Sequence, residues 1–424
     1  MLRAMKRLPQ EHPPAPRGTG LALGALAFVM FFHYDVVRPV TDAMFTHDLG
    51  YERLPWAWLG VAVTAGVVTA GYNSLTSRFA LMPLLAVASL TSAALLAVLL
   101  MVRQAGVAGS SYALYIWKDV HIVVLAETFW MFANAAFPSR SAARLYGLFC
   151  AAGSTGAALG NRAARALLSQ GWSTTEVLWA GTGLLVVLAA GALGVHRLDR
   201  IRARAADDSG VTERPPWWSG FRDVRAIPLL GWMLLLVVTT QLVINLVDYR
   251  FNGVVQSAYP GETERAAAMS VVYEAISWGA LATQVLTGPV LALLGLRVTV
   301  LTLPLLVGGA AGAMLVAPRF VTAAVAKVMT KVVDYGWFRA TKEMLYIPLA
   351  YGPRARGKAV IDILGYRGAK AGASLLVLGL GALAADAGVD FGLAALFVVW
   401  VVAAWRILRA HARAEASLAD DPTR

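Results

Sequence analysis

The side chains of this chain most able to do chemistry are Lys, Arg, Asp and Glu residues that interrupt long apolar segments. Asp35, Arg38 and Asp42 follow one another at spacings of three and four, which places them on one face of a helix. Between Lys327 and Lys370 the basic residues outnumber the acidic ones. Excess buried positive charge is what an anionic ligand would neutralise, and Arg and Lys donate well to phosphate oxygens. The pattern therefore favours an organic anion, plausibly a phosphorylated one, as ligand.

Two groups of these charges also have a purely structural explanation. Arg339 and Glu343 are four residues apart, and so are Lys358 and Asp362, a spacing at which opposite charges pair on a helix. If both pairs form, these four residues stabilise their helices and only the remaining basic residues, such as Lys331 and Lys370, are available to a ligand. The sequence leaves the structural and the ligand-binding interpretations open.

Three further acidic residues offer a different chemistry, the binding of a proton. Glu127, Asp248 and Glu274 fall inside apolar segments, and burial raises the pKa of a lone carboxyl group, so any of them could carry a proton. These residues leave open an alternative in which the function depends on the binding and release of a proton. Arg162 and Arg165 lie toward the end of their segment, where long basic side chains can extend to a membrane surface.

The segments that carry these charges are long enough to cross a membrane. Of the 424 residues, 58% are hydrophobic and 15% charged, whereas soluble domains carry about 25% charged residues. Roughly 20 helical residues cross the hydrocarbon layer. We predict spans at 20–45, 56–77, 80–102, 112–136, 141–168, 177–196, 227–251, 266–293, 297–316, 319–348, 357–384 and 388–410. Placing one charge at the bilayer centre costs about 2.5–3.5 kcal/mol of insertion free energy. Because the spans carry many charges, we expect a hydrated central path between them.

The placement of Lys and Arg predicts the topology. With both termini in the cytoplasm, the outer loops would hold only Arg53, Arg103, Arg265 and Arg319, and most basic residues would lie inside, as the positive-inside rule requires. The predicted parts are a cytoplasmic tail at 1–19, a six-helix bundle at 20–196, a cytoplasmic linker at 197–226, a second six-helix bundle at 227–410 and a tail at 411–424. Six plus six helices with a long joint is the layout of the major facilitator fold. We therefore predict an all-α polytopic membrane protein of about twelve transmembrane helices.

The sequence excludes several other classes of function. Cys150 is the single cysteine, so an intramolecular disulfide is impossible. No phosphate-binding Walker loop, HExxH or CxxC motif occurs. We therefore predict that the protein is not an enzyme and that it has no catalytic residue, no metal-binding residue and no cofactor. The net charge of +12 does not form a basic face with interleaved aromatic residues, so a nucleic-acid partner is not expected. The basic tail at 1–19 lacks a short apolar region and a cleavage site, which favours a retained cytoplasmic tail over a signal peptide.

Two stretches resemble the ATP/ADP translocase family of plastids and intracellular bacteria, the NTP/NDP exchange transporters. The first is TKEMLYIPL at 341–349, followed by GKAVIDI at 357–363 and GAKAGAS at 368–374. The second contains Phe129-Trp130, Phe132-Ala-Asn134 and then ARLYGLF at 143–149. This chain departs from the family at the first span, where Thr41 stands before Asp42 in place of the usual lysine.

The resemblance implies a major-facilitator-like exchanger of nucleotides, ATP/ADP or other NTP/NDP pairs, that works by alternating access without hydrolysis. It also implies a bacterial inner membrane as the location, and we expect a monomer with lipid and an anionic substrate as its partners. The alternative is a proton- or ion-coupled carrier of another organic or phosphorylated anion. From charge and resemblance together, the candidate substrate-binding or gating residues are Arg38, Asp42, Lys118, Glu127, Glu274, Lys331, Lys342, Lys358, Asp362, Arg367 and Lys370.

Overall fold

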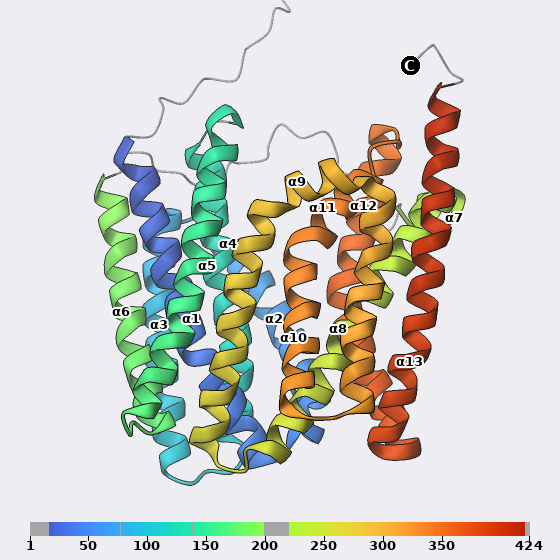
Figure 1. Ribbon diagram of the computed structural model, residues 1–424. Helices are drawn as coiled ribbons and strands as arrows, with labels where there is room; N and C mark the ends of the chain where they lie inside the picture. The colour runs from blue at the N-terminus through green and yellow to red at the C-terminus, as the bar shows by residue number, and fades with distance from the viewer. Residues whose placement is uncertain (1–16, 77, 138, 199–219, 420–424) are drawn as a thin grey trace, which may run out of the picture.

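The computed structural model describes residues 17–76, 78–137, 139–198 and 220–419, and in these ranges the chain is all-α (Figure 1). The first half contains α1 (Arg17–Leu49), the short η1 (Tyr51–Arg53), α2 (Leu54–Thr76), α3 (Leu81–Gln104), α4 (Ser110–Ala136), α5 (Ser139–Ser169) and α6 (Thr174–Leu198). The second half contains α7 (Gly220–Ala226), α8 (Pro228–Ala258), α9 (Glu262–Val316), α10 (Phe320–Val333), η3 (Asp334–Phe338), α11 (Arg339–Leu345), α12 (Tyr351–Asp362), η4 (Ile363–Gly368) and α13 (Ala369–Ala419). Residues 1–16 and 420–424 of the predicted tails and 199–219 of the predicted linker lie outside the described residues, whereas 17–19 belong to α1 and 411–419 continue α13.

Long apolar helices confirm the prediction of a polytopic membrane protein. By length and composition, seven helices within the described ranges could each cross a membrane. Two of these are longer than one crossing requires, and both contain a break: α9 at Gly295, where φ is 69°, and α13 at Ala384 and Ala385. The sequence predicts interruptions at the same two places. The count of twelve spans stays a prediction.

The two halves of the chain form two groups of helices that meet along the centre of the molecule (Figure 1). In the first group α1 packs against α4, α5 and α6, and in the second α8 packs against α10 and α13. The groups contact each other where α9 packs on α5 and α1, and where α13 packs on α2. A continuous core of buried apolar side chains runs through both groups. The charged residues that remain buried therefore lie between helices and not in a separate domain.

Two glycines allow α1 and α5 to approach each other at backbone distance. Gly156 and Gly160 form the G-x-x-x-G pattern that permits close packing of membrane helices. A Cβ atom added at Gly156 would clash with the carbonyl oxygen of Phe28, and one at Gly160 would clash with that of Phe32. The backbone of α1, which carries Arg38 and Asp42, is thus held directly against α5.

We expect alanine at Gly156 to destabilise the protein by about 1–3 kcal/mol, the usual cost of forcing extra atoms into a packed site. The clashing atom belongs to the backbone, so no side-chain rotation relieves it. Gly147 on the same helix is the matched control, because a Cβ atom there would meet nothing within 4 Å. The apparent melting temperature in detergent should fall for Gly156→Ala and not for Gly147→Ala. Equal melting temperatures would show that the α1–α5 contact is not tight.

Candidate functional site

A polar cavity of about 260 Å³ lies where the two groups of helices meet. Side chains from both halves line it, and they come from α1, α2 and α4 on one side and from α8, α9, α10, η3 and α13 on the other. The lining residues are Tyr34, Arg38, Asp42, Trp58, Tyr115, Lys118, Asp119, Gln241, Ile244, Asn245, Asp248, Asn252, Tyr273, Lys327, Lys331, Tyr335 and Lys370. Five of them are basic and three acidic, so the lining has an excess of two positive charges.

An ion-pair network from the first half occupies one side of this cavity. The Lys118 ammonium lies 2.7 Å from an Asp42 carboxylate oxygen and 3.0 Å from one of Asp119. The second oxygen of Asp42 accepts a hydrogen bond of 2.8 Å from the Tyr273 hydroxyl, and Lys370 lies 3.3 Å from Asp119. Tyr273 and Lys370 belong to the second half of the chain. The network therefore joins the two halves across the cavity.

The second half contributes an equivalent pair on the opposite side. Lys327 of α10 pairs with Asp248 of α8, and only 1% of the Lys327 side chain is exposed. If α9 is divided at Gly295, α8 and α10 are the first and fourth long helical stretches of their half, as α1 and α4 are of theirs. Each half therefore places a lysine of its fourth stretch against an aspartate of its first.

Two cations of the cavity are less neutralised than the others. Within the described ranges, Lys331 has neither a hydrogen bond nor an ion pair. The nearest carboxylate contact of Arg38 is with Asp35 at 3.9 Å, and its guanidinium lies 4.0 Å from the centre of the Tyr273 ring. Lys331 lies one helical turn beyond Lys327, so both point into the same space. These two cations account for the excess positive charge.

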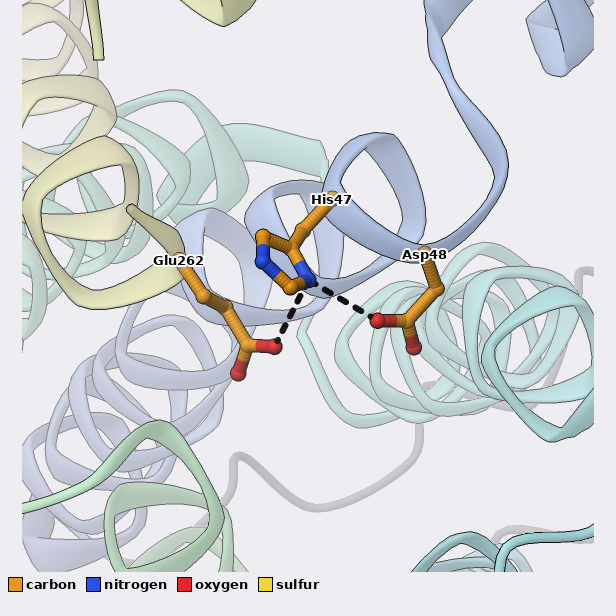
Figure 2. A group of neighbouring side chains, drawn as sticks. All are labelled: His47, Asp48 and Glu262. Atoms are coloured by element: carbon orange, nitrogen blue, oxygen red, sulfur yellow. Dashed lines mark hydrogen bonds and ion pairs between the residues drawn. The ribbon is translucent and has the colours of Figure 1, made fainter. Parts of the chain in front are cut away.

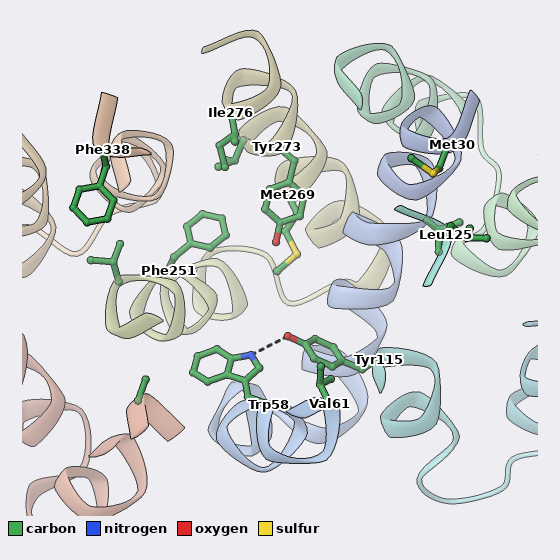
Figure 3. Close-up of a cluster of buried hydrophobic side chains, with 14 of the residues drawn as sticks. Met30, Trp58, Val61, Tyr115, Leu125, Phe251, Met269, Tyr273, Ile276 and Phe338 are labelled. Atoms are coloured by element: carbon green, nitrogen blue, oxygen red, sulfur yellow. Dashed lines mark hydrogen bonds between the residues drawn. The ribbon is translucent and has the colours of Figure 1, made fainter. Parts of the chain in front are cut away.

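Aromatic and amide side chains complete the lining. Trp58 donates a hydrogen bond of 3.0 Å from its indole nitrogen to the Tyr115 hydroxyl, and Tyr273 faces the same region from α9 (Figure 3). Gln241 and Asn245 of α8 add polar groups that can both donate and accept. An aromatic side chain can stack on any nucleotide base, because every base has a flat π face. The cavity therefore combines cationic groups for an anion with flat surfaces and amides for a polar ring.

Five of the predicted site residues line the cavity: Arg38, Asp42, Lys118, Lys331 and Lys370. Glu127 is half-buried on α4 and is not part of the lining. Arg367 falls in η4, and its side chain lies outside the described residues. Lys327 and the aromatic residues were not among the predicted site residues, and Asp248 was named only as a possible proton carrier. The spacing of four between Lys327 and Lys331 was a signal that could have added Lys327.

The remaining predicted residues form ion pairs away from the cavity. Lys342 pairs with Asp362 at 2.7 Å, and Lys358 pairs with Glu343 at 2.6 Å. The two acidic residues of the expected spacing-of-four pairs, Glu343 and Asp362, thus pair with lysines of the other helix, so each ion pair joins α11 to α12.

Glu274 of α9 lies between two arginines of α5. Its carboxylate is 3.4 Å from Arg162 and 3.2 Å from Arg165. The two arginines were expected to extend to the membrane surface as one possibility, and here they instead join the first half of the chain to the second. Glu274 is therefore not an isolated acid.

Wide turns interrupt two helices beside the cavity. The π-helical η3 contains Tyr335, which lines the cavity, and the π-helical η4 ends two residues before Lys370. Such turns are rare and are frequent at functional sites, because the extra residue breaks the regular hydrogen-bond ladder. The segments beyond them, α11 and α12, carry the paired residues Lys342 and Asp362. The ends of these helices can thus change direction relative to the cavity.

Polar residues join the two halves at the end of the molecule that holds the α1–η1 and α8–α9 turns. Arg103 of α3 lies 3.0 Å from Asp48 and 2.7 Å from Glu262. His47 lies 3.0 Å from Asp48 and 3.6 Å from Glu262 (Figure 2). The Tyr51 hydroxyl donates to Asp386 at 2.9 Å. Arg103 pairs with both carboxylates, so this cluster is an ionic contact between the halves.

Comparison with known proteins gives this geometry a family context. Residues 224–413 match the family model described as TLC ATP/ADP transporter. The ADP,ATP carrier protein 1 of Chlamydia trachomatis is 35% identical over 109 residues, which is 24% of this chain and 21% of that protein. The protein of the same name in Chlamydia muridarum is 27% identical over 355 residues, 70% of this chain and 65% of that one. The matched regions span less than two thirds of these relatives.

Solved transporter structures share the fold. A mutant of the nucleoside transporter NupG has a TM-score of 0.62 at 10% identity, covering 94% of this chain and 99% of its own. An inward-facing, unoccupied bacterial homologue of the human lysosomal transporter Spinster scores 0.60 at 14% identity, covering 94% and 97%. A D-xylose-proton symporter scores 0.60 at 15%, covering 92% and 97%. The fold is therefore major-facilitator-like, and residues 224–413 are similar to the TLC ATP/ADP transporter family.

Proposed function

We propose that this protein is a membrane carrier that exchanges nucleotides across a bacterial inner membrane by alternating access. The observation that carries the proposal is the central cavity, whose lining has two positive charges in excess and comes from both halves of the chain. The carriers to which the chain is related are named for ADP and ATP. A nucleotide matches the cavity because it combines several negative charges with a flat polar ring.

In this proposal the phosphates bind at Lys331 and Arg38. Lys331 forms no ion pair among the described residues, and Arg38 has only the distant contact of 3.9 Å with Asp35. Charge-assisted hydrogen bonds from Arg and Lys to phosphate are short and roughly twice as strong as neutral ones. Trp58 and Tyr115 would face the base. Lys118 and Lys327 would keep their ion pairs with Asp42 and Asp248 and would contribute to the electrostatic potential of the cavity.

The cavity must widen to hold a whole nucleotide. Its volume of about 260 Å³ lies below the roughly 300–1,000 Å³ of pockets that enclose drug-sized ligands. Rocking of the two halves, residues 20–196 against residues 227–410, would supply the space. With both termini in the cytoplasm, the ionic contact around Arg103 lies on the outer side, so the described state is closed to the outside.

The lining residues favour transport over catalysis. The cavity-lining side chains within the described ranges include no serine, cysteine or histidine, so no Ser–His or Cys–His pair is present there. Obligatory exchange follows from the charge excess. An empty carrier would have to reorient with repelling cations and no counter-anion, and a bound nucleotide removes that barrier.

Exchange predicts that labelled ATP enters proteoliposomes only when they contain nucleotide. We expect uptake into ADP-loaded vesicles to exceed uptake into empty vesicles at least tenfold, because the empty carrier rarely reorients. Vesicles loaded with adenosine are the control for the phosphate requirement. Uptake that ignores internal ADP but follows an imposed proton gradient would instead support the ion-coupled carrier.

A further inference from the structure

A second basic groove lies far from the central cavity, between the beginning of α8 and the last turns of α13. It has a volume of about 280 Å³. Arg406, Arg409 and Arg413 line one wall, and apolar side chains such as Leu229 and Ala410 line the rest. No acidic residue is among its described lining residues. The groove thus joins three positive charges to an apolar floor.

The three arginines have unused hydrogen-bond donors. They follow one another at spacings of three and four, so they share one face of α13, and all three are exposed. In the described part of the chain none forms an ion pair. Tryptophan rings support two of them instead. The Arg409 guanidinium lies 3.5 Å from the centre of the Trp405 ring, and that of Arg406 lies 5.9 Å from Trp232.

Helix length places this groove at the membrane surface. Arg406 follows the break at Ala385 by 21 residues, which is about 31 Å of helix at 1.5 Å per residue. The hydrocarbon layer is about 30 Å thick, so Arg406 emerges where the lipid headgroups begin. Trp232 and Trp405 have the position of interfacial aromatic residues. By the topology proposed above, this is the cytoplasmic side.

We propose that the groove binds one anionic phospholipid. Its phosphate would accept hydrogen bonds from Arg406, Arg409 and Arg413, and an acyl chain would lie along the apolar floor at Leu229 and Ala410. Basic pockets between membrane helices on this side are suited to anionic headgroups. A free phosphate would use the arginines and leave the apolar floor uncovered. A phospholipid satisfies both parts of the groove.

Native mass spectrometry of the full chain can test this. Protein is released from nanodiscs that contain phosphatidylglycerol or phosphatidylcholine, and the retained lipid is counted. The test variant combines Arg406→Gln, Arg409→Gln and Arg413→Gln. The control combines Arg78→Gln, Arg197→Gln and Arg222→Gln, which removes the same charge from exposed residues elsewhere. We expect wild type and control to retain one more phosphatidylglycerol than the test variant.

Thermal unfolding supplies a second readout, since a ligand that binds only the folded protein raises its melting temperature. Phosphatidylglycerol should stabilise wild type and control, and its affinity for the test variant should fall at least tenfold. Excess inorganic phosphate should not replace the lipid.

Three results would overturn the proposal. One is equal loss of lipid in test and control variants, which would indicate general surface charge. Another is full competition by phosphate, which would indicate a free anion. The third is unchanged lipid binding in the test variant, which would show that the three arginines do not hold the lipid.

Discussion

Replacing Lys331 with glutamine should lower nucleotide exchange by at least about 30-fold. Lys331 is the cavity cation without an ion pair in the described part of the chain, so in the proposed function its charge is neutralised by the substrate. Removing one member of a buried charge pair costs about 2–5 kcal/mol, and each 1.4 kcal/mol is a factor of ten. The measurement is initial uptake of labelled ATP into ADP-loaded proteoliposomes, corrected for the amount of inserted protein.

Two further variants make the result specific. Lys331→Arg keeps the charge and should retain part of the activity. Arg319→Gln removes an exposed charge from the start of the same helix and should exchange at the wild-type rate. Full activity in Lys331→Gln would rule out Lys331 as a phosphate contact. If Lys358→Gln were inactive at the same time, the phosphate site would have to be assigned to the α11–α12 ion pairs instead.

Removing the carboxylate of Asp248 should destabilise the protein by about 3–5 kcal/mol. Asp248→Leu leaves the Lys327 ammonium without its partner, and that side chain is only 1% exposed. An uncompensated buried charge is the costly case, whereas replacing both partners with apolar residues is often neutral. The Asp248→Leu, Lys327→Met double variant should therefore recover most of the loss. Apparent melting temperatures in detergent measure both effects.

The double variant also separates stability from transport. We expect it to be folded and yet impaired in exchange, because the aspartate and lysine shape the charge of the cavity. A double variant as unstable as Asp248→Leu would show that the two residues do not stabilise each other. Lys118→Met offers a comparison in the other half. It leaves Asp42 with the hydrogen bond from Tyr273 and Asp119 with Lys370, so its cost should be smaller.

Apolar patterning was sufficient to predict most helices, because a membrane requires long apolar segments whatever their neighbours are. The prediction of 112–136 corresponds to α4 at Ser110–Ala136. The prediction of 319–348 covers α10 and α11 but gives no sign of the π turn at η3. That turn depends on packing, since at Gly336 a Cβ atom would lie 2.5 Å from the Thr283 side chain. Such a contact between distant residues has no local sequence signal.

The site was harder to predict because a buried charge can face a cavity or another helix. Arg38, Asp42 and Lys118 were identified from their depth in apolar segments, and they line the cavity. Lys342 and Lys358 were chosen partly from the resemblance, and both instead pair between α11 and α12. The rotation of each helix decides which case applies, and that rotation is set by contacts with the whole bundle. Spacing along one segment cannot supply it.

If the protein is the proposed exchanger, the two excess positive charges of the cavity would also make it sensitive to voltage. A charge that crosses the full membrane potential exchanges about 2.3 kcal/mol per 100 mV, so two would exchange roughly 4.6 kcal/mol. The electric field would therefore hold the cations of an empty carrier toward the negative side. A bound nucleotide with three or four negative charges would make the net charge of the cavity and its ligand negative. Exchange of species with unequal charge would then carry current, and an applied potential would set its direction.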